Sequence, residues 1–408
     1  MSQGRGGEAK EYLQRALEIA EKSLGREHPE ALWSRVSLAL REAEKNPQME
    51  IGPIVERARA LAETKMGSTH PQLIPAFTRV GRTYMIRQDW LTAYRYLKRG
   101  SEIAEQKERY FHEGKRPSRN EFTAPHTSAI QAAFRIAKSP QPPGLPDEVF
   151  RLSQIALQTA AAKALGQMAA RFGSGSGPLA KLVRERQDLL GQRTAAERRF
   201  FLQKTGATGS QDAGSELSAI EARLTAVDEQ LRREFPEYAN LANPEPLTIA
   251  QVQAQLRSDE VLVQFVEAPK VATLASEIFV WAIDKQRSRW ASVELDGQAV
   301  DRLVRALRCG LDDGQWIASA QNPGGPSQCR QLLDLNSQAI GRHPLPFDLK
   351  KSHLLYRALF GSVEDLVKDK HILVVPSGVL GSVPFHVLVT EAPANWPKAV
   401  THIARPAG

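Results

Sequence analysis

Residues His371–Thr390 read HILVVPSGVLGSVPFHVLVT, and this stretch decides the fold of the C-terminal part of the chain. An apolar run, Ile372–Val375, meets a Pro-Ser-Gly turn, and a second apolar segment follows that is interrupted by Pro384. A short apolar run bounded by turn residues is typical of a buried strand in a parallel sheet. We therefore expect a strand at Ile372–Val375 with cover on both of its faces.

The sequence upstream of this strand has the pattern of an α/β domain. Ser352–Lys368 carries apolar residues at helical spacing, which predicts an amphipathic helix immediately before the strand. Short helices are also expected at Thr248–Leu256, with Thr248 as N-cap, and at Val300–Leu307. Three apolar and partly β-branched runs predict further strands, of which the last two form a hairpin: Val261–Val266, Ile278–Ile283 and Trp290–Leu295.

Two segments of this section resemble a known family. Asp259–Phe265, an acidic pair followed by a hydrophobic strand, and His371–Thr390 resemble the opening strands of the CHAT domain, a caspase-like cysteine peptidase family usually preceded by tetratricopeptide repeats. The resemblance spans Pro246–Thr390 and implies a caspase-like α/β fold. In that family the catalytic His and Cys lie on later strands, whereas only Glu391–Gly408 follow here. We therefore expect a partial domain that lacks the catalytic half and has no peptidase activity.

The strands that such a domain would lack have a structural consequence. Without them, the sheet begun at Ile372–Val375 would keep an open edge. An open edge presents unpaired backbone groups and favours pairing with another chain. We therefore expect self-association through the C-terminal region.

A repeat marks the N-terminal part of the chain. Gly25–Pro29, GREHP, recurs as Gly67–Pro71, GSTHP, 42 residues further on, and the same register relates Ala20 to Ala62 and Ala104. A fixed period in this range predicts a helical solenoid, in which each helix pair buries its apolar face only against its neighbours. The glycines are placed to end one helix with a positive φ, and the prolines to begin the next helix.

The best single unit of this repeat is Val80-Gly81-x-x-Tyr84 followed by Ala93. It is close to the Leu-Gly-x-x-Tyr…Ala pattern of tetratricopeptide repeats, and Met1–Lys107 resembles the long repeats of the kinesin-light-chain type. The resemblance implies that the concave face of the repeats binds a protein or peptide, and it leaves the ligand unspecified.

A helical section connects the two parts. Ser139–Gly144 is rich in proline and predicts a linker, and an alanine-rich helix is expected at Pro146–Phe172. Leu179–Leu202 and a heptad stripe predict the two arms of an antiparallel coiled-coil hairpin, joined by the loop Gly206–Gly214. The stripe consists of Leu217, Ile220, Leu224, Val227 and Leu231. A parallel homodimer through the stripe is the competing interpretation.

Composition indicates the class of protein and its compartment. The chain has 408 residues, of which 42% are hydrophobic and 25% charged, as is typical of soluble globular proteins. No stretch is long and apolar enough to cross a bilayer, and the polar segment Met1–Gly7 lacks the apolar core of a secretory signal. Two cysteines, Cys309 and Cys329, cannot form a disulfide framework. Together these features predict a cytoplasmic protein.

The net charge of +8 permits weak attraction to acidic partners. One basic cluster, formed by Lys115, Arg116 and Arg119, lies close in sequence to Tyr110 and Phe111. No recognisable nucleic-acid-binding motif accompanies this cluster. We interpret it as a solvated loop between helices, and we do not expect nucleic acid as a partner.

The cysteines and histidines provide poor candidates for catalysis. A cysteine peptidase needs a thiolate that a nearby imidazole makes nucleophilic. Cys309 lies near the end of a predicted helix, and Cys329 lies in the polar segment Gly310–Gly341, where we expect a surface loop. His371 opens a strand, and His386 lies within an apolar segment. We therefore predict no catalytic residues in this chain.

No metal or cofactor site is predicted either. His28 and His70 lie a full repeat apart, and no Cys, Asp or Glu accompanies them at the spacing of a metal site. We interpret both as turn histidines between paired helices. The sequence also contains no Walker loop, no Gly-x-Ser-x-Gly elbow and no His-Glu-x-x-His motif.

These observations divide the chain into three segments: tetratricopeptide-like helical repeats at 1–138, a helical linker with a coiled-coil hairpin at 146–236, and the N-terminal part of a CHAT-like α/β domain at 246–408. The function they favour is a protein- or peptide-binding scaffold or sensor of a CHAT-type proteolytic system. Two alternatives stay open. The chain is a fragment of a caspase-like cysteine endopeptidase whose His/Cys dyad lies beyond residue 408, or it is a non-functional gene fragment.

Overall fold

The computed structural model describes residues 3–46, 48–66, 68, 73–110, 119–137, 143–157, 176–204, 213–242, 245–317, 324–335 and 347–392. The chain divides into two compact units, Met1–Pro246 and Leu247–Gly408. Within the described residues, no helix combines the length and the apolar character needed to cross a bilayer.

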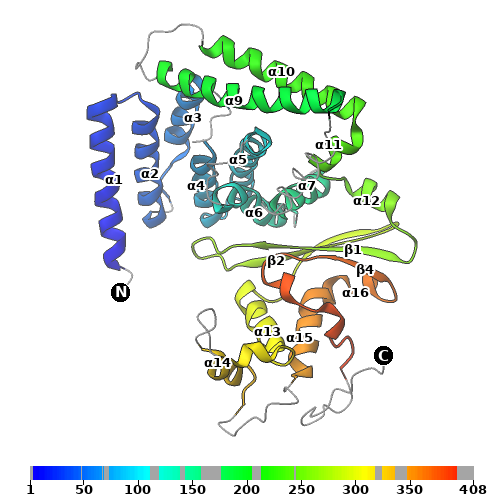
Figure 1. Ribbon diagram of the computed structural model, residues 1–408. Coiled ribbons are helices and arrows are strands. Elements are labelled where there is room, and N and C mark those ends of the chain that lie inside the picture. Colours follow the sequence, from blue (N-terminus) through cyan, green and yellow to red (C-terminus); the bar gives the residue numbers. More distant parts are fainter. Residues whose placement is uncertain are drawn as a thin grey trace. The chain divides into compact units, whose positions relative to one another are not determined.

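The described part of the N-terminal unit is built from consecutive helices (Figure 1): α1 Gln3–Leu24, α2 Pro29–Lys45, α3 Gly52–Met66, α4 Leu73–Ile86, α5 Trp90–Tyr110, α6 Arg119–Ile136, α7 Leu145–Leu157, α9 Pro178–Lys204, α10 Ala213–Glu234 and α11 Pro236–Ala242. From α1 to α3 and again from α4 to α7, helices that follow one another along the chain pack side by side. Ala58 of α3 and Val80 of α4 belong to one buried apolar cluster. This arrangement is consistent with the predicted solenoid. Most of the predicted alanine-rich helix and the loop of the hairpin lie outside the described residues.

The 42-residue register corresponds to equivalent positions in this series of helices. Ala20, Ala62 and Ala104 are all buried, and they lie on α1, α3 and α5. Gly25 follows α1 with a φ of +88°, and Pro29 begins α2, as predicted. The second predicted turn, 67–71, lies almost entirely outside the described residues.

The best repeat unit has a physical explanation in the contact between α4 and α5. A Cβ added at Gly81 would lie 2.5 Å from Leu97 Cγ, so a glycine is needed for the two helices to approach this closely. Ala93 is fully buried in the same contact region. Tyr84 stacks on Tyr96 with ring centroids 5.8 Å apart and an interplanar angle of 5°. The residues that carry the resemblance are therefore those that set the spacing of this helix pair.

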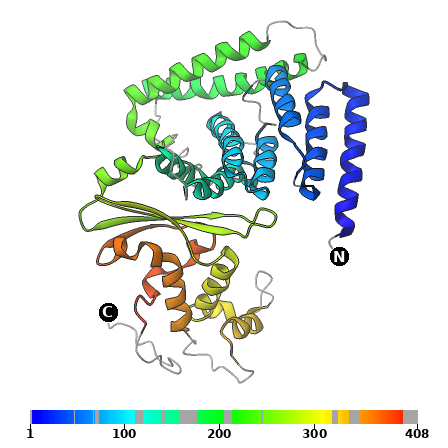
Figure 2. The same ribbon diagram turned by 180° about the vertical axis from the view of Figure 1, so that it is seen from behind.

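The helices α9 and α10 form the predicted hairpin, and Figures 1 and 2 show the two long arms side by side. Leu224 is fully buried, and the rest of its heptad stripe packs with it against Leu182, Val183, Leu189 and Leu190 of the first arm. Ion pairs join Arg186 to Asp228 and Arg193 to Glu221. The later residue of the first arm thus pairs with the earlier residue of the second arm, so the two helices run antiparallel. This burial within one chain favours the antiparallel hairpin over the parallel homodimer.

The C-terminal unit contains a mixed four-stranded sheet with the order β3-β2-β1-β4. The strands are β1 Glu260–Ala268, β2 Glu277–Asp284, β3 Ser288–Ser292 and β4 His371–Val375. β1 pairs antiparallel with β2 and parallel with β4, and β2 forms the predicted antiparallel hairpin with β3. The helical segments of this unit are α12 Ile249–Gln255, α13 Gly297–Cys309, η1 Asp313–Trp316, α14 Gly325–Leu332, α15 Leu349–Phe360, η2 Gly361–Val363, α16 Glu364–Val367, η3 Gly378–Ser382 and η4 Phe385–Val387.

The core of this unit lies between one face of the sheet and two helices. Val263 and Phe265 of β1 and Val280 of β2 pack with Val304 of α13 and Leu359 of α15. Both views show α13 and α15 on the same side of the sheet. Burial is continuous along most of β2 and through the second half of β1, so both faces of these strands are covered there. Alternate residues share one face of a strand, and the face with Val263, Phe265 and Val280 is the one that packs on the two helices.

Thr248 caps α12 as predicted, and it forms a reciprocal capping box with Gln251. Two other boundaries differ from the prediction. The helix expected at Ser352–Lys368 begins earlier, at Leu349, because the Asp348 side chain caps it by accepting a hydrogen bond from the Lys351 backbone N–H. It ends at Phe360, and the rest of the expected helix is divided between η2 and α16. The polar segment Gly310–Gly341, expected as a loop, contains η1 and α14, because tertiary packing outweighs its weak periodicity.

The expectation that β4 is covered on both faces was wrong. Val374 packs against the core, whereas Ile372 and Leu373 are 38% and 45% exposed. The reason is the strand order, because β4 lies at the edge of the sheet and, among the strands that the structure describes, pairs with β1 alone. A parallel strand needs cover on both faces when it is central, and an edge strand can leave part of its surface to solvent.

The packing of the heptad stripe inside the hairpin can be tested by mutation. We expect Leu224→Ala to lower the free energy of unfolding of the N-terminal unit by about 2–4 kcal/mol, because it removes a buried side chain and leaves a cavity. Urea denaturation followed by circular dichroism measures the change. Glu229→Ala, at an exposed position of the same helix, is the control and should have little effect. Equal stability of the two variants would contradict the buried seam.

Candidate binding surface and cysteine pair

A network of polar side chains joins α3 to α5, which are equivalent helices of successive repeats in the 42-residue register. The Tyr96 hydroxyl donates a hydrogen bond to Glu56 Oε1. Arg59 Nε donates to Glu56 Oε2 over 2.9 Å, and its Nη1 donates to Glu63 Oε2 over 2.8 Å. One carboxylate therefore accepts from a phenol of α5 and a guanidinium of its own helix.

Helix packing holds this network in place. Tyr96 is fixed by its stack on Tyr84 and by Phe77, whose ring centroid lies 6.1 Å away. Further along α5, Arg99 donates to the backbone carbonyl of Ser68 over 3.1 Å and to Glu102 over 3.1 Å. The polar row on α5 therefore continues beyond Tyr96 at helical spacing.

The protonation states of this network are set by its own contacts. Burial raises the pKa of Tyr96, and the neighbouring Glu56 carboxylate raises it further. Burial alone would raise the pKa of Glu56, but the hydrogen bonds from Tyr96 and Arg59 outweigh it and hold that pKa below its usual value. The hydrogen bond to Glu56 raises the pKa of Arg59. At neutral pH the surface therefore presents a neutral phenol, a carboxylate and a guanidinium.

This chemistry suits recognition, because the groups can donate and accept hydrogen bonds in fixed positions. No sequence motif singles out these residues. The available signal was the register, since Tyr96 stands one repeat after Ile54 and two repeats after Tyr12, all large apolar or aromatic residues. Its hydrogen bond to Glu56 depends on how the helices pack, and the register cannot predict it.

The two cysteines lie together in a disulfide, with Cα atoms 5.5 Å apart and a sequence separation of 20. Cys309 ends α13 and Cys329 lies on α14, and both are buried. The prediction that Cys329 lies in a surface loop was therefore wrong. Two cysteines are too few for a disulfide framework, but they suffice for the single disulfide observed here. Neither sulfur is a free thiol in this structure.

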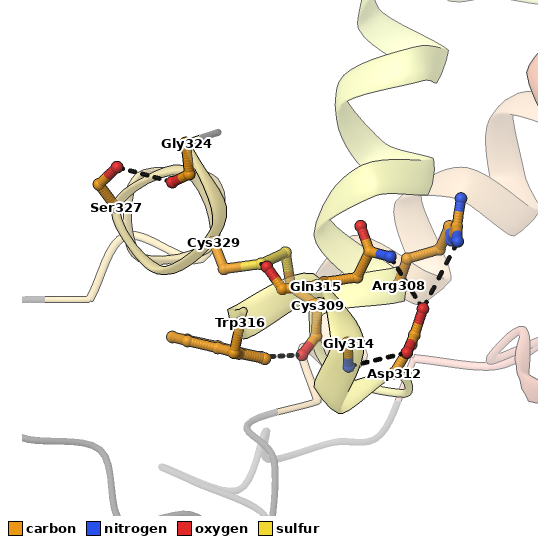
Figure 3. The surroundings of a disulfide bond; sticks show 9 residues. All are labelled: Arg308, Cys309, Asp312, Gly314, Gln315, Trp316, Gly324, Ser327 and Cys329. Atoms are coloured by element: carbon orange, nitrogen blue, oxygen red, sulfur yellow. Dashed lines mark hydrogen bonds and ion pairs between the residues drawn. A yellow bond between two sulfur atoms is a disulfide. The ribbon is translucent and has the colours of Figure 1, made fainter. Parts of the chain in front are cut away.

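Figure 3 shows the disulfide and the described residues around it. Trp316 Nε1 donates to the carbonyl oxygen of Cys309 over 2.7 Å. Asp312 accepts from the Gly314 backbone N–H over 2.9 Å and from Gln315 Nε2 over 2.8 Å. The hydrogen bond from Gln315, followed by that from Gly314 and the charge of Arg308, holds the pKa of Asp312 below its usual value. The disulfide and these hydrogen bonds tie α13, η1 and α14 into one cluster.

The histidines considered in the sequence lie in separate surroundings. His28 is half-buried in the turn between α1 and α2, as predicted, and His70 lies outside the described residues. His371 is exposed at the start of β4, with Nε2 3.6 Å from Asp259 Oδ2. His386 lies in η4. In the part of the chain that the structure describes, no group of three or more His, Cys, Asp or Glu side chains could hold a metal ion.

The Pro-Ser-Gly turn after β4 packs against the end of β1. Ser377 Oγ accepts a hydrogen bond from the Glu267 backbone N–H over 2.9 Å. Gly378 has a φ of +53°, and a Cβ at that position would lie 2.0 Å from Glu267 Oε2. The positive φ favours glycine at this position, and a larger residue would also displace the Glu267 carboxylate. Burial raises the pKa of Glu267, and the nearby Asp301 carboxylate adds to the effect.

Comparison with known proteins supports the repeat class of the N-terminal helices. A family model for the tetratricopeptide repeat matches residues 1–30, which comprise α1 and the first residues of α2. None of the curated proteins matches the chain. Repeats of this kind build extended binding surfaces for protein partners, so the polar network on α3 and α5 is the surface that we consider for binding.

The raised pKa of Glu267 predicts a pH dependence of stability. A carboxyl whose pKa is higher in the folded state than in the unfolded state takes up protons on folding, so the free energy of unfolding falls as pH rises from the ordinary value through the raised one. We expect Glu267→Gln to remove this loss and to raise the melting temperature relative to wild type more at pH 7 than at pH 4. Glu294→Gln, at an exposed position, is the control. A constant difference across this range would contradict the burial effect.

Proposed function

We propose that this chain is a protein- or peptide-binding scaffold or sensor whose repeat helices hold the ligand. The observation that carries the proposal is the network of Glu56, Arg59 and Tyr96 on equivalent helices of successive repeats. Its groups are already oriented by helix packing, so a ligand would bind without the entropic cost of ordering them. The repeat match at residues 1–30 supports the same class of function.

The ligand that this surface fits best is an extended peptide. An extended backbone offers alternating N–H donors and carbonyl acceptors, and the network offers carboxylate acceptors beside guanidinium donors. The stacked rings of Tyr84 and Tyr96 lie next to these charges and add apolar contact area. A peptide with polar backbone groups and an apolar or aromatic side chain would match both features.

The C-terminal unit links the proposal to a CHAT-type proteolytic system. Its support is the resemblance of Asp259–Phe265 and His371–Thr390, together with the parallel pairing of β1 with β4 and the helices α13 and α15 on one face of the sheet. In this proposal the chain acts beside a peptidase and contributes recognition, because its two cysteines are joined and supply no thiolate nucleophile.

The cytoplasm is the location that we propose for this function. A disulfide in that compartment is usually transient or redox-sensing. The bridge between Cys309 and Cys329 would therefore be reversible there. Alkylation of the two cysteines in intact cells would report their state, and a permanently oxidised pair would speak against this location.

The edge of the sheet is the proposed site of self-association in the C-terminal unit. β4 pairs with one neighbour in the sheet, and Ile372 and Leu373 are partly exposed along it. A strand edge with exposed apolar side chains is a template for pairing with another chain.

The binding proposal is tested with peptides selected on the wild-type chain from a phage-displayed random library. We expect Arg59→Glu to raise the dissociation constant of the selected peptides by at least about tenfold, a loss of roughly 1.4 kcal/mol. Arg233→Glu makes the same charge change at an exposed position of α10 and should change the constant by less than about twofold. If both variants bind the peptides as tightly as wild type does, the network is not the ligand surface.

The edge proposal is tested by sedimentation velocity over a range of protein concentrations. We expect Leu373→Lys to reduce self-association, because a charged side chain on an edge strand opposes strand addition. Leu354→Lys, at an exposed position of α15, should leave association unchanged. Equal association of wild type and both variants would rule out this edge.

A further inference from the structure

The outer face of α1 carries an exposed apolar stripe. Tyr12 and Ile19 are 70% and 59% exposed, and Ala16 between them is also exposed. The three residues follow one another at intervals of four and three, so they lie on one face of the helix. α1 packs against α2 through a different face, which carries the buried Ala20. In Figure 1, α1 stands at the end of the row of repeat helices.

The repeat register shows what this face does elsewhere in the same chain. Two repeats further on, the residues that correspond to Tyr12, Ala16 and Ile19 are Tyr96, Gly100 and Ile103 of α5. These residues form the face of α5 that packs on α3 and α4. Tyr96 contacts Glu56 and stacks on Tyr84.

The other two positions on α5 make the same kind of contact. A Cβ at Gly100 would lie 3.4 Å from Phe77 Cβ and 3.6 Å from the Ile74 carbonyl oxygen, both of α4. Ile103 is fully buried in a cluster with Ala62 of α3 and Leu73 of α4. The stripe on α1 is therefore a surface of the type that this chain uses to pack helix against helix.

The charges beside the stripe indicate which helix it accepts. Glu11, Arg15, Glu18 and Lys22 are exposed, lie along the flank of the stripe that faces away from α2, and alternate in sign. Within the described residues, none of these four side chains forms an ion pair. When two copies of this helix run antiparallel about a two-fold axis, the same flank of each copy meets the other in reversed order. Glu11 then faces Lys22 of the second copy, and Arg15 faces its Glu18.

The apolar stripe has the same self-complementarity. Around a two-fold axis near Ala16, Tyr12 of one copy meets Ile19 of the other, and the small Ala16 lets the two helices approach closely at the centre. We infer that a second copy of this chain docks on α1 and forms an antiparallel α1–α1 contact. This surface is separate from the β4 edge and from the network on α3 and α5.

The contact is expected to be weak and reversible. A single pair of helices buries less than the roughly 1,200–2,000 Å² of a standard stable interface. We therefore expect a dissociation constant for the dimer in the micromolar range or above. The chain would then be largely monomeric when dilute and would dimerise where it is locally concentrated.

The α1–α1 contact is tested by reversing charges on the flank. The parent protein is the full chain with Leu373→Lys, so that the β4 edge does not contribute to dimerisation. One variant is Glu11→Lys with Glu18→Lys, which makes all four flank positions positive. The other is Arg15→Glu with Lys22→Glu, which makes them all negative. Glu, Lys and Arg have similar helix propensities, so both variants should keep the helix, which circular dichroism checks.

Sedimentation velocity from about 1 to about 200 µM, a range suited to a weak interface, then measures the dimer. We expect each variant alone to dimerise at least about tenfold more weakly than the parent, and an equimolar mixture of the two to recover the parent's affinity. Glu229→Lys, at an exposed position of α10, should leave the dimer unchanged. A parent that stays monomeric, variants that dimerise like the parent, or a mixture that behaves like its separate components would each overturn the inference.

Discussion

The close contact between α4 and α5 at Gly81 is the constraint on which the arrangement of the repeat helices depends. Because a side chain at this position would collide with Leu97, only glycine lets the two helices reach their observed separation. That separation brings Tyr84 onto the ring of Tyr96. Tyr96 is then directed toward Glu56 of the preceding pair. One missing Cβ therefore connects the packing of a helix pair with the chemistry of the surface proposed for binding.

The C-terminal unit depends on a different constraint, the pairing of β4 with β1 across more than a hundred residues of sequence. Parallel strands require a long connection, and here that connection includes α13 and α15, which cover the paired strands on one face. The same pairing brings the Ser377 hydroxyl to the backbone of Glu267. The turn that follows β4 is thus held by β1, and the half-buried carboxyl of Glu267 lies where the two strands end.

The disulfide adds a local restraint to this unit. By the chain-entropy model, closing a loop of about this length restricts the unfolded chain enough to contribute roughly 3 kcal/mol to stability. The apolar cluster around the bridge, with Cys309, Cys329, Ala306 and Leu333, is small. The position of α14 therefore depends strongly on the bridge, and a change in the redox state of the cysteines would act first on this helix.

Local patterns in the sequence determined the elements of this protein, because helix and strand periodicity, caps and turn residues depend on neighbouring positions. The 42-residue register, the hairpin stripe through Leu224, the cap at Thr248 and the strand at Ile372–Val375 were all predicted in this way. Tertiary structure decided what depends on residues far apart in the chain. It brought Cys309 to Cys329, joined Tyr96 to Glu56 and placed β4 at the edge of its sheet. These outcomes follow from packing between elements, and no local pattern records which distant element a side chain will meet.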